Sequence, residues 1–184
     1  MKKESTALYI LRLAMTLLII TAVVAALLAA VNSVTAPVIA AANEAKTQEA
    51  VSLVLPGGGQ PIDFAGADET GLVSEVYAGE GGYAVKVAPA GFGGAIEMMV
   101  GVGKDGKVLR VTVIKHAETP SLGAVAAAKG SAGESFRDSF IGLSGEVSVS
   151  KDGGEADTIS GATITSRAVA AGVNAALACV ENLG

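Results

Sequence analysis

The sequence Asp157-Thr158-Ile159-Ser160-Gly161-Ala162-Thr163 leads directly into the last stretch of the chain with helical spacing of apolar residues. It is a hydroxyl-rich turn that contains a glycine and opens a helix. Unpaired N–H groups and the helix dipole favour an anion at such a helix end, and Ser and Thr hydroxyls add further donors. The stretch therefore predicts a phosphate-binding turn, in which a threonine hydroxyl can also carry a phosphoester. An ordinary helix cap, with Ser160 or Thr163 at the N-cap, is the alternative.

The terminal helix is predicted over residues 163–183, and its apolar side chains define one face. These side chains recur three or four residues apart, at Val169, Val173, Leu177 and Val180. This spacing places them on one side of a helix. We expect that side to pack on a sheet, which puts the phosphate-binding turn at the edge of that sheet.

Four stretches of alternating apolar and polar residues precede this helix and predict strands. They are residues 73–77, 83–87, 96–102 and 108–115. The glycine-rich stretch from Gly79 to Gly82 separates the first pair and Asp105-Gly106 the second, which predicts two hairpins. Short helices are expected at 124–129 and 135–140, and an edge strand at 147–149. The predicted fold class is therefore α+β, with a small antiparallel sheet packed with helices.

Two motifs together resemble one protein family. The pattern D-x-x-S-G-A-T at residues 157–163 resembles the flavinylation motif of the FMN-binding domain family. This domain is shared by the G subunit of the Rnf electron-transport complex and the C subunit of the sodium-translocating NADH:quinone reductase. The segment His-Ala-Glu-Thr-Pro-Ser-Leu-Gly at residues 116–123 is similar to the family's H-x-E-T-P-G-L-G. Residues 82–87, 91–97 and 101–111 follow the family's order of strands and turns, so the resemblance covers most of the chain.

The resemblance implies a covalent cofactor. FMN would be joined through a phosphoester to Thr163 by a dedicated flavin transferase that uses FAD. The transferase would recognise the motif residues Asp157, Ser160, Gly161, Ala162 and Thr163. The isoalloxazine ring would be held by Glu118, Thr119, Leu122 and Gly123, and the phosphate by Ser160, Gly161, Ala162 and Thr165.

The chain departs from the family pattern at two positions. Ser121 stands where the family has glycine, and a positive φ there would strain the turn by about 1 kcal/mol. Phe136 stands where tryptophan is expected. Because the chain has no tryptophan and few aromatic residues, ring stacking is not expected to hold a flavin strongly, and covalent anchoring would prevent its loss.

The family's role implies an electron carrier. An Rnf-type complex couples electron transfer between ferredoxin and NAD to sodium or proton translocation, and this chain resembles its flavin-bearing subunit. It has no ferredoxin, nicotinamide or iron–sulfur motif of its own, so we expect it to relay electrons among other membrane subunits without catalytic residues. Three alternatives are a stand-alone membrane-anchored flavoprotein, the quinone-reductase C subunit, and a binding module that has kept the fold without flavin.

Residues 13–31 predict one transmembrane helix. They contain no charged residue, and a helix of this length is about 28 Å long, close to the ~30 Å hydrocarbon core of a bilayer. A cleaved signal peptide is the alternative, because Lys2 and Lys3 precede the apolar stretch and residues 40–42 are small. Residues 1–12 would then be cytoplasmic. Residues 32–71 are expected to form a juxtamembrane helix, beginning near Pro37, and a polar linker, and residues 72–184 the extracytoplasmic FMN-binding domain.

Composition argues against several other functions. Cys179 is the only cysteine, so the chain can form no internal disulfide, and we expect neither a zinc nor an iron–sulfur site. Its apolar neighbours predict a buried, inert thiol. The only histidine, His116, is expected at a strand end without a catalytic role. Because three of the 13 basic and one of the 18 acidic residues precede residue 31, the remainder has a net charge of −7, which disfavours nucleic-acid binding.

The charge distribution predicts the orientation in the membrane. Lys2, Lys3 and Arg12 precede the apolar stretch, and residues 32–43 contain no basic residue, so the N-terminus should stay in the cytoplasm. Protease added to spheroplasts should therefore digest the domain. Protection of the domain until the membrane is permeabilised would reverse this orientation.

Overall fold

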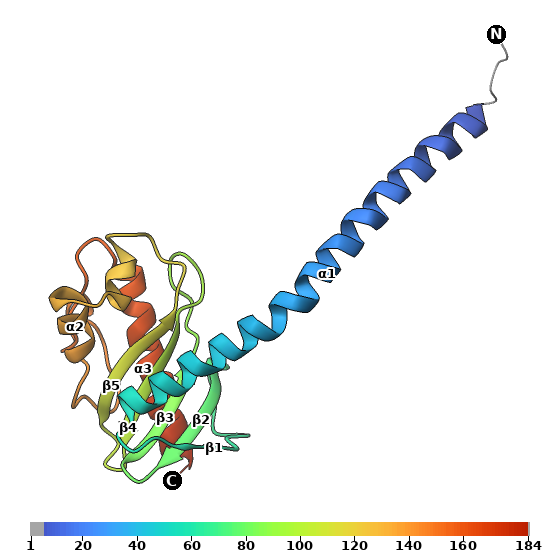
Figure 1. Cartoon of the computed structure of the whole chain (residues 1–184). Helices are drawn as coiled ribbons and strands as arrows, with labels where there is room; N and C mark the ends of the chain where they lie inside the picture. The colour runs from blue at the N-terminus through green and yellow to red at the C-terminus, as the bar shows by residue number, and fades with distance from the viewer. Residues whose placement is uncertain (1–5, 184) are drawn as a thin grey trace. The chain divides into compact units, whose positions relative to one another are not determined.

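The computed structural model describes residues 6–183 and has the expected α+β fold. The chain divides into two compact units between Ala45 and Lys46. The first unit contains most of a long helix, α1. The second contains the end of α1, a five-stranded sheet and further helices (Figure 1).

Helix α1 (Thr6–Val54) is one helix of 49 residues. Its side chains from Leu8 to Ala45 are all exposed, although most are apolar. A helix that is apolar on every side and not covered by protein has the properties of a membrane-spanning segment. The chain therefore has an N-terminal membrane anchor, and the predicted span 13–31 lies within α1.

The predicted start of a separate helix near Pro37 is wrong, because α1 runs without interruption through Pro37 to Val54. Proline removes one N–H donor and crowds the preceding turn, which kinks or ends a helix depending on the residues around it. The sequence on both sides of Pro37 is rich in alanine, the strongest helix former. The helix therefore continues on either side of this single defect.

The sheet is an antiparallel meander in which neighbouring strands follow the order of the sequence. Its strands are β1 (Gln60–Ile62), β2 (Val73–Gly79), β3 (Gly82–Val87), β4 (Glu97–Gly103) and β5 (Val108–Lys115). Both predicted hairpins, β2–β3 and β4–β5, are confirmed. Strand β1 was not predicted, because three residues that include Pro61 are too short to show a period. It lies in the expected linker and pairs with β2.

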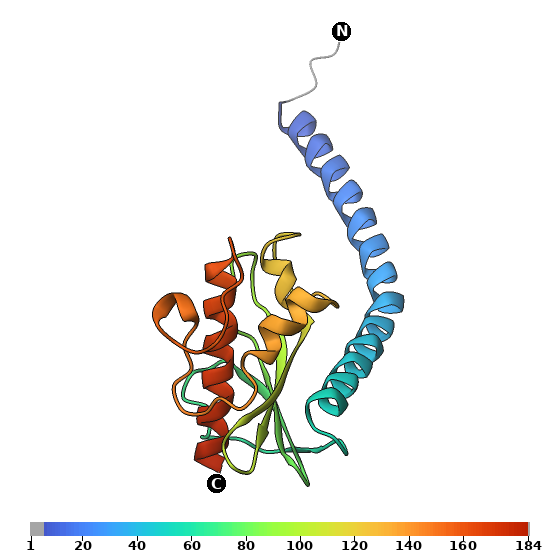
Figure 2. The same cartoon turned by 90° about the vertical axis from the view of Figure 1, so that its left-hand side faces the viewer.

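One face of the sheet is covered by α3 (Thr163–Leu183) and by α2 (Ser131–Asp138), as Figure 2 shows. Val169 and Val173 of α3 are fully buried, and Leu177 and Val180 nearly so, which confirms the predicted packing face. Although α3 is long and apolar enough to cross a membrane, 67% of its most apolar segment is buried in this domain. It is therefore a core helix.

The other face of the sheet is covered by the last turns of α1, residues 46–54. Val51 and Val54 are buried there against Tyr77, Ala84 and Met99, with Leu55 just beyond the helix. Gly101 of β4 permits this close approach, because a Cβ at that position would lie 2.4 Å from the carbonyl oxygen of Val54.

A polar network secures the same end of α1. The Lys86 ammonium donates to Glu75 Oε1 at 2.6 Å and to Thr47 Oγ1 at 3.3 Å. Burial raises the pKa of the Glu75 carboxyl, but hydrogen bonds from Lys86 and Tyr77 outweigh it and the pKa is lowered. The end of α1 thus belongs structurally to the sheet domain.

The predicted edge strand at 147–149 is wrong. Val149 forms only an isolated bridge with Ala156, and both backbone groups of Val147 are bonded to the side-chain amide of Asn174. Asn174 Oδ1 accepts from the Val147 N–H at 2.8 Å, and its Nδ2 donates to the Val147 carbonyl at 2.9 Å. A side chain of α3 therefore takes the place of a neighbouring strand.

The two short helices predicted at 124–129 and 135–140 differ from the structure in type or bounds. The first is the 3₁₀ helix η1 (Gly123–Ala127), and the second, α2, begins four residues earlier than predicted.

We predict that Gly101→Ala destabilises the domain by about 1–3 kcal/mol, because the added methyl group would collide with the backbone of α1. The matched control is Gly81→Ala, whose Cβ would make an ordinary 3.5 Å contact with Leu55. Urea denaturation followed by circular dichroism measures both. Equal midpoints for the two variants would show that α1 does not need this close contact.

Candidate functional site

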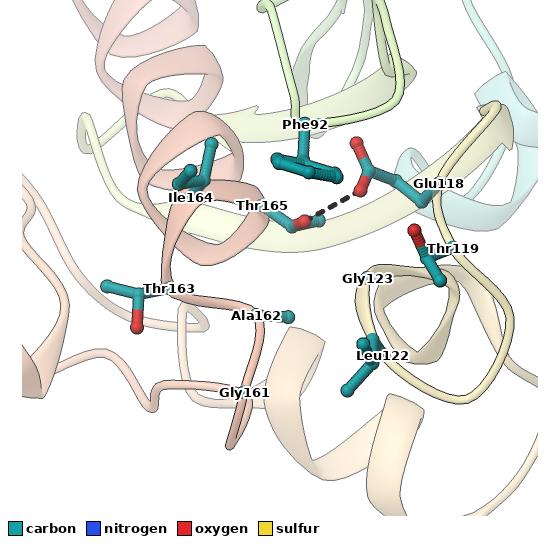
Figure 3. Close-up of a pocket in the computed structure, with 10 residues that line it drawn as sticks. All are labelled: Phe92, Glu118, Thr119, Leu122, Gly123, Gly161, Ala162, Thr163, Ile164 and Thr165. Carbon is teal, nitrogen blue, oxygen red and sulfur yellow. Dashed lines mark hydrogen bonds between the residues drawn. The ribbon is translucent and has the colours of Figure 1, made fainter.

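The two sequence motifs meet at a cavity of about 290 Å³, which we call the α3 cavity. Its walls come from the β3–β4 loop, from the turn after β5 and from the start of α3 (Figure 3). The residues that line it are Phe92, Glu118, Thr119, Leu122, Gly123, Gly161, Ala162, Thr163, Ile164 and Thr165. Seven residues proposed from the sequence to hold a cofactor, and the proposed attachment residue Thr163, therefore lie together.

Glu118 joins the three walls of the cavity. It is only 6% exposed, and its Oε2 accepts a hydrogen bond from Thr165 Oγ1 at 2.8 Å (Figure 3). Its Oε1 accepts from the backbone N–H of Gly93 at 3.1 Å. One carboxylate thus connects the β3–β4 loop and the start of α3 to the turn after β5.

The backbone encloses this carboxylate closely. A Cβ at Gly123 would lie 2.3 Å from Glu118 Oε2, and one at Gly91 would lie 2.2 Å from Oε1. Side chains at these two positions would therefore displace the carboxylate. Only glycine at these two positions leaves enough room for the Glu118 carboxylate.

Thr163 is the first residue of α3 and is half-buried. Its Oγ1 accepts a hydrogen bond from the Lys151 ammonium at 3.2 Å. No pattern in the sequence marked Lys151, because it lies twelve residues before Thr163 in an irregular segment. A positive charge nevertheless stands beside the hydroxyl at the start of a 21-residue helix.

Lys151 is held in place by its neighbours in the 3₁₀ helix η2 (Ser150–Asp152). The Ser150 and Thr158 hydroxyls are 3.0 Å apart. Arg167 of α3 donates to both carboxylate oxygens of Asp152, at 2.6 and 2.8 Å. This hydrogen bonding lowers the pKa of Asp152 and raises the pKa of Arg167.

The turn before α3 is held by Ser166. This buried hydroxyl accepts from the Ile159 N–H and donates to the Ala162 carbonyl, both at 3.0 Å. Because α3 begins at Thr163, its N-cap position falls on Ala162 rather than on Ser160 or Thr163.

Asp157 and Ser160 are exposed and do not line the α3 cavity. They line a separate surface pocket, which Ser121 and Phe136 also line. The structure thus divides the motif into an outward-facing part, which includes these two residues, and a part that forms the cavity.

Phe92 and Ile164 were missed by the sequence analysis, although both line the cavity. Phe92 lies within the glycine-rich stretch 91–94, and Ile164 directly follows the proposed acceptor. Neither position breaks a helix or strand pattern in a way that marks it as a site residue.

The two departures from the family pattern have different consequences. Ser121 has φ 62° and is the only non-glycine residue with positive φ in the part of the chain that the structure describes. The turn at Ser121 is therefore strained by about 1 kcal/mol. Phe136 is buried and meets Phe140 edge to face at 5.4 Å. It belongs to the core and does not line the α3 cavity.

The remaining titratable candidates are structural. His116 follows β5, and its Nδ1 accepts from the Glu118 N–H at 3.2 Å. Cys179 is fully buried, as predicted, and burial together with the charge of Asp68 raises the pKa of its thiol. Within residues 6–183, no three His, Cys, Asp or Glu side chains are grouped to hold a metal ion.

The similarity to known proteins extends over both the membrane helix and the domain. Residues 91–178 match the FMN-binding domain family. The G subunit of the Na(+)-translocating ferredoxin:NAD(+) oxidoreductase complex of Acetobacterium woodii is 33% identical over 95% of this chain and 93% of its own length. The G subunit of the ion-translocating oxidoreductase complex of Methanosarcina acetivorans is 30% identical over 91% and 93%. The G subunit of the proton-translocating ferredoxin:NAD(+) oxidoreductase complex of Clostridium ljungdahlii is 41% identical over 52% and 51%.

We predict that Glu118→Ala lowers the free energy of unfolding by about 1–3 kcal/mol, because the buried Thr165 hydroxyl and the Gly93 N–H lose their acceptor. Glu155→Ala, which removes an exposed carboxylate, is the matched control and should leave stability unchanged. Chemical denaturation measures both variants. A stability of Glu118→Ala equal to that of the control would show that this carboxylate does not hold the walls together.

Proposed function

Since the chain belongs to the family of G subunits of the Rnf-type ion-translocating ferredoxin:NAD oxidoreductase complexes, we propose that it carries FMN on Thr163 through a phosphoester. When bound, FMN supplies one- and two-electron redox chemistry. The chain's own residues hold the cofactor and position it. The protein then passes electrons to and from other membrane subunits of the complex.

The observation that carries the attachment is the environment of the Thr163 hydroxyl. Thr163 lines an apolar cavity on the first turn of α3, and its hydroxyl accepts a hydrogen bond from the Lys151 ammonium at 3.2 Å. A phosphoester at this oxygen would retain a negative charge. The free N–H groups and dipole of the helix end, together with the lysine, would stabilise that charge.

The α3 cavity fits the ring of the cofactor better than the whole molecule. Its volume of about 290 Å³ is just below the ~300–1,000 Å³ typical of ligand pockets. Leu122 and Gly123 offer an apolar wall, and the exposed Thr119 offers a hydroxyl. Both oxygens of Glu118 already accept hydrogen bonds from the protein, so Glu118 and Thr165 act mainly by holding the walls.

The outward-facing part of the motif suits recognition by a flavin transferase. Asp157, Ser160 and Gly161 are exposed, so an enzyme can reach them in the folded protein. Ala162 is 7% exposed, so its contribution is a small side chain that packs beneath the turn. Thr163 is then presented between the recognised surface and the cavity.

The membrane helix and the family define the setting. We propose that α1 anchors the protein in the cell's inner membrane, with the N-terminus in the cytoplasm and the FMN-binding domain outside. Similarity to G subunits over nearly the whole chain favours this role over the quinone-reductase C subunit or a stand-alone flavoprotein. The relatives are named for sodium translocation or for proton translocation. Membership of the family therefore does not by itself specify the coupling ion.

We predict that the full chain, produced together with the flavin transferase, is yellow and remains fluorescent in a denaturing gel, and that Thr163→Ala removes this fluorescence. Thr112→Ala removes a threonine hydroxyl on β5, outside the α3 cavity, and should keep the flavin. Intact-mass measurement should show one FMN joined with loss of one water. Attachment at Thr165, or an unmodified wild-type chain beside a flavinylated control protein, would refute the assignment.

A further inference from the structure

Exposed apolar side chains gather at the α3 cavity. Within residues 46–183, the large apolar residues that remain exposed are Leu53, Phe92, Leu122, Ile141 and Ile164. Three of these five line the cavity, namely Phe92, Leu122 and Ile164. Single exposed apolar residues are normal on a protein surface, but a cluster around one cavity marks a binding site.

Phe92 is the most exposed of the five, at 69%. The other three phenylalanines are in or against the core, since Phe136 and Phe140 are buried and Phe64 packs on the main cluster. Phe92 is thus the one phenylalanine that the fold leaves outside the core.

The backbone on both sides of Phe92 is fixed. The Gly91 N–H donates to the Gly94 carbonyl at 2.8 Å, and the Ile96 N–H donates to the Pro89 carbonyl at 2.9 Å. The Gly93 N–H donates to Glu118. The loop therefore presents the aromatic ring from a defined position, although the ring itself contributes little to the core.

We propose that Phe92 forms the second apolar wall of the flavin site and packs against the isoalloxazine ring, with Leu122 as the other wall. Figure 3 shows Phe92 and Leu122 on opposite sides of the opening, with Ile164 beside Phe92. Two flat or aliphatic walls match the two faces of an aromatic ring. This inference rests on the proposed attachment of FMN to Thr163.

The position of Phe92 also explains how a chain with so few aromatic residues holds a flavin ring. The phosphoester would tether one end of the cofactor only, so the ring needs contacts of its own. A fixed loop that carries one phenylalanine provides such a contact without a tryptophan. Phe92 is accordingly a positioning residue, and its removal should loosen the ring without releasing FMN.

The first test uses the absence of tryptophan from the chain. An indole close to a flavin quenches flavin fluorescence by electron transfer, whose rate falls steeply with the distance between the two rings. Phe92→Trp in the full flavinylated chain should therefore lose most of its flavin emission relative to the unsubstituted protein. Ile141→Trp places an indole at an exposed position that does not line the cavity, and its flavin emission should be retained.

The second test removes the wall. In Phe92→Ala, iodide should quench the flavin more strongly than in the unsubstituted chain, because one face of the ring becomes open to solvent. Ile141→Ala should not change iodide quenching. Because the Phe92 side chain is largely exposed, both variants at this position should fold, which circular dichroism checks.

The outcomes separate this inference from the proposed function. If intact mass shows FMN on every variant, but Phe92→Trp is as bright as Ile141→Trp and Phe92→Ala is quenched no more than Ile141→Ala, the ring does not contact Phe92. The exposed cluster would then be assigned to contact with another subunit, and this proposal would be overturned. If the unsubstituted chain carries no FMN under competent conditions, the proposed function fails and this inference fails with it.

Discussion

The site depends on one buried carboxylate. Glu118 accepts hydrogen bonds from the Thr165 hydroxyl and the Gly93 N–H, and so joins three segments that are far apart in the sequence. A buried polar group must keep its partners, because an unmade hydrogen bond there is more destabilising than a made one is stabilising. This requirement fixes the β3–β4 loop, the turn after β5 and the first turn of α3 relative to one another, and the cavity is the space between them.

The scaffold behind this carboxylate is the packing of α3 on the sheet. Val169 and Val173 are buried in the core, which sets where the helix begins and therefore where Thr163 lies. The ion pair between Asp152 and Arg167 holds η2 against α3, and this contact places Lys151 beside the Thr163 hydroxyl. An apolar cavity and a cationic helix end are thus adjacent, an arrangement that supports the proposed attachment of FMN to Thr163.

The sequence determined the elements whose residues repeat with a period or form a recognisable motif. The alternation in β2 to β5, the Asp-Gly turn and the apolar face of α3 were sufficient to predict two hairpins and a terminal helix. The two motifs pointed to Thr163, Glu118 and Leu122, which the structure brings to one cavity. Prediction failed at the short strand β1, at Pro37 and at residues 147–149, because neighbours distant in the sequence decide these segments. Val147, for example, has its backbone hydrogen bonds satisfied by Asn174 rather than by a strand.

The tertiary structure alone decided which residues share the site and what each does there. It brought Phe92 and Ile164 to the cavity, placed Lys151 next to Thr163, and turned Asp157 and Ser160 outward. It also showed that Glu118 serves the protein's own walls, and that Ser121 has the positive φ that glycine would tolerate. Local sequence specifies period, turn chemistry and motif, because these act over a few residues. The meeting of residues 92, 118, 151 and 163 depends on packing across the whole domain, which no local pattern encodes.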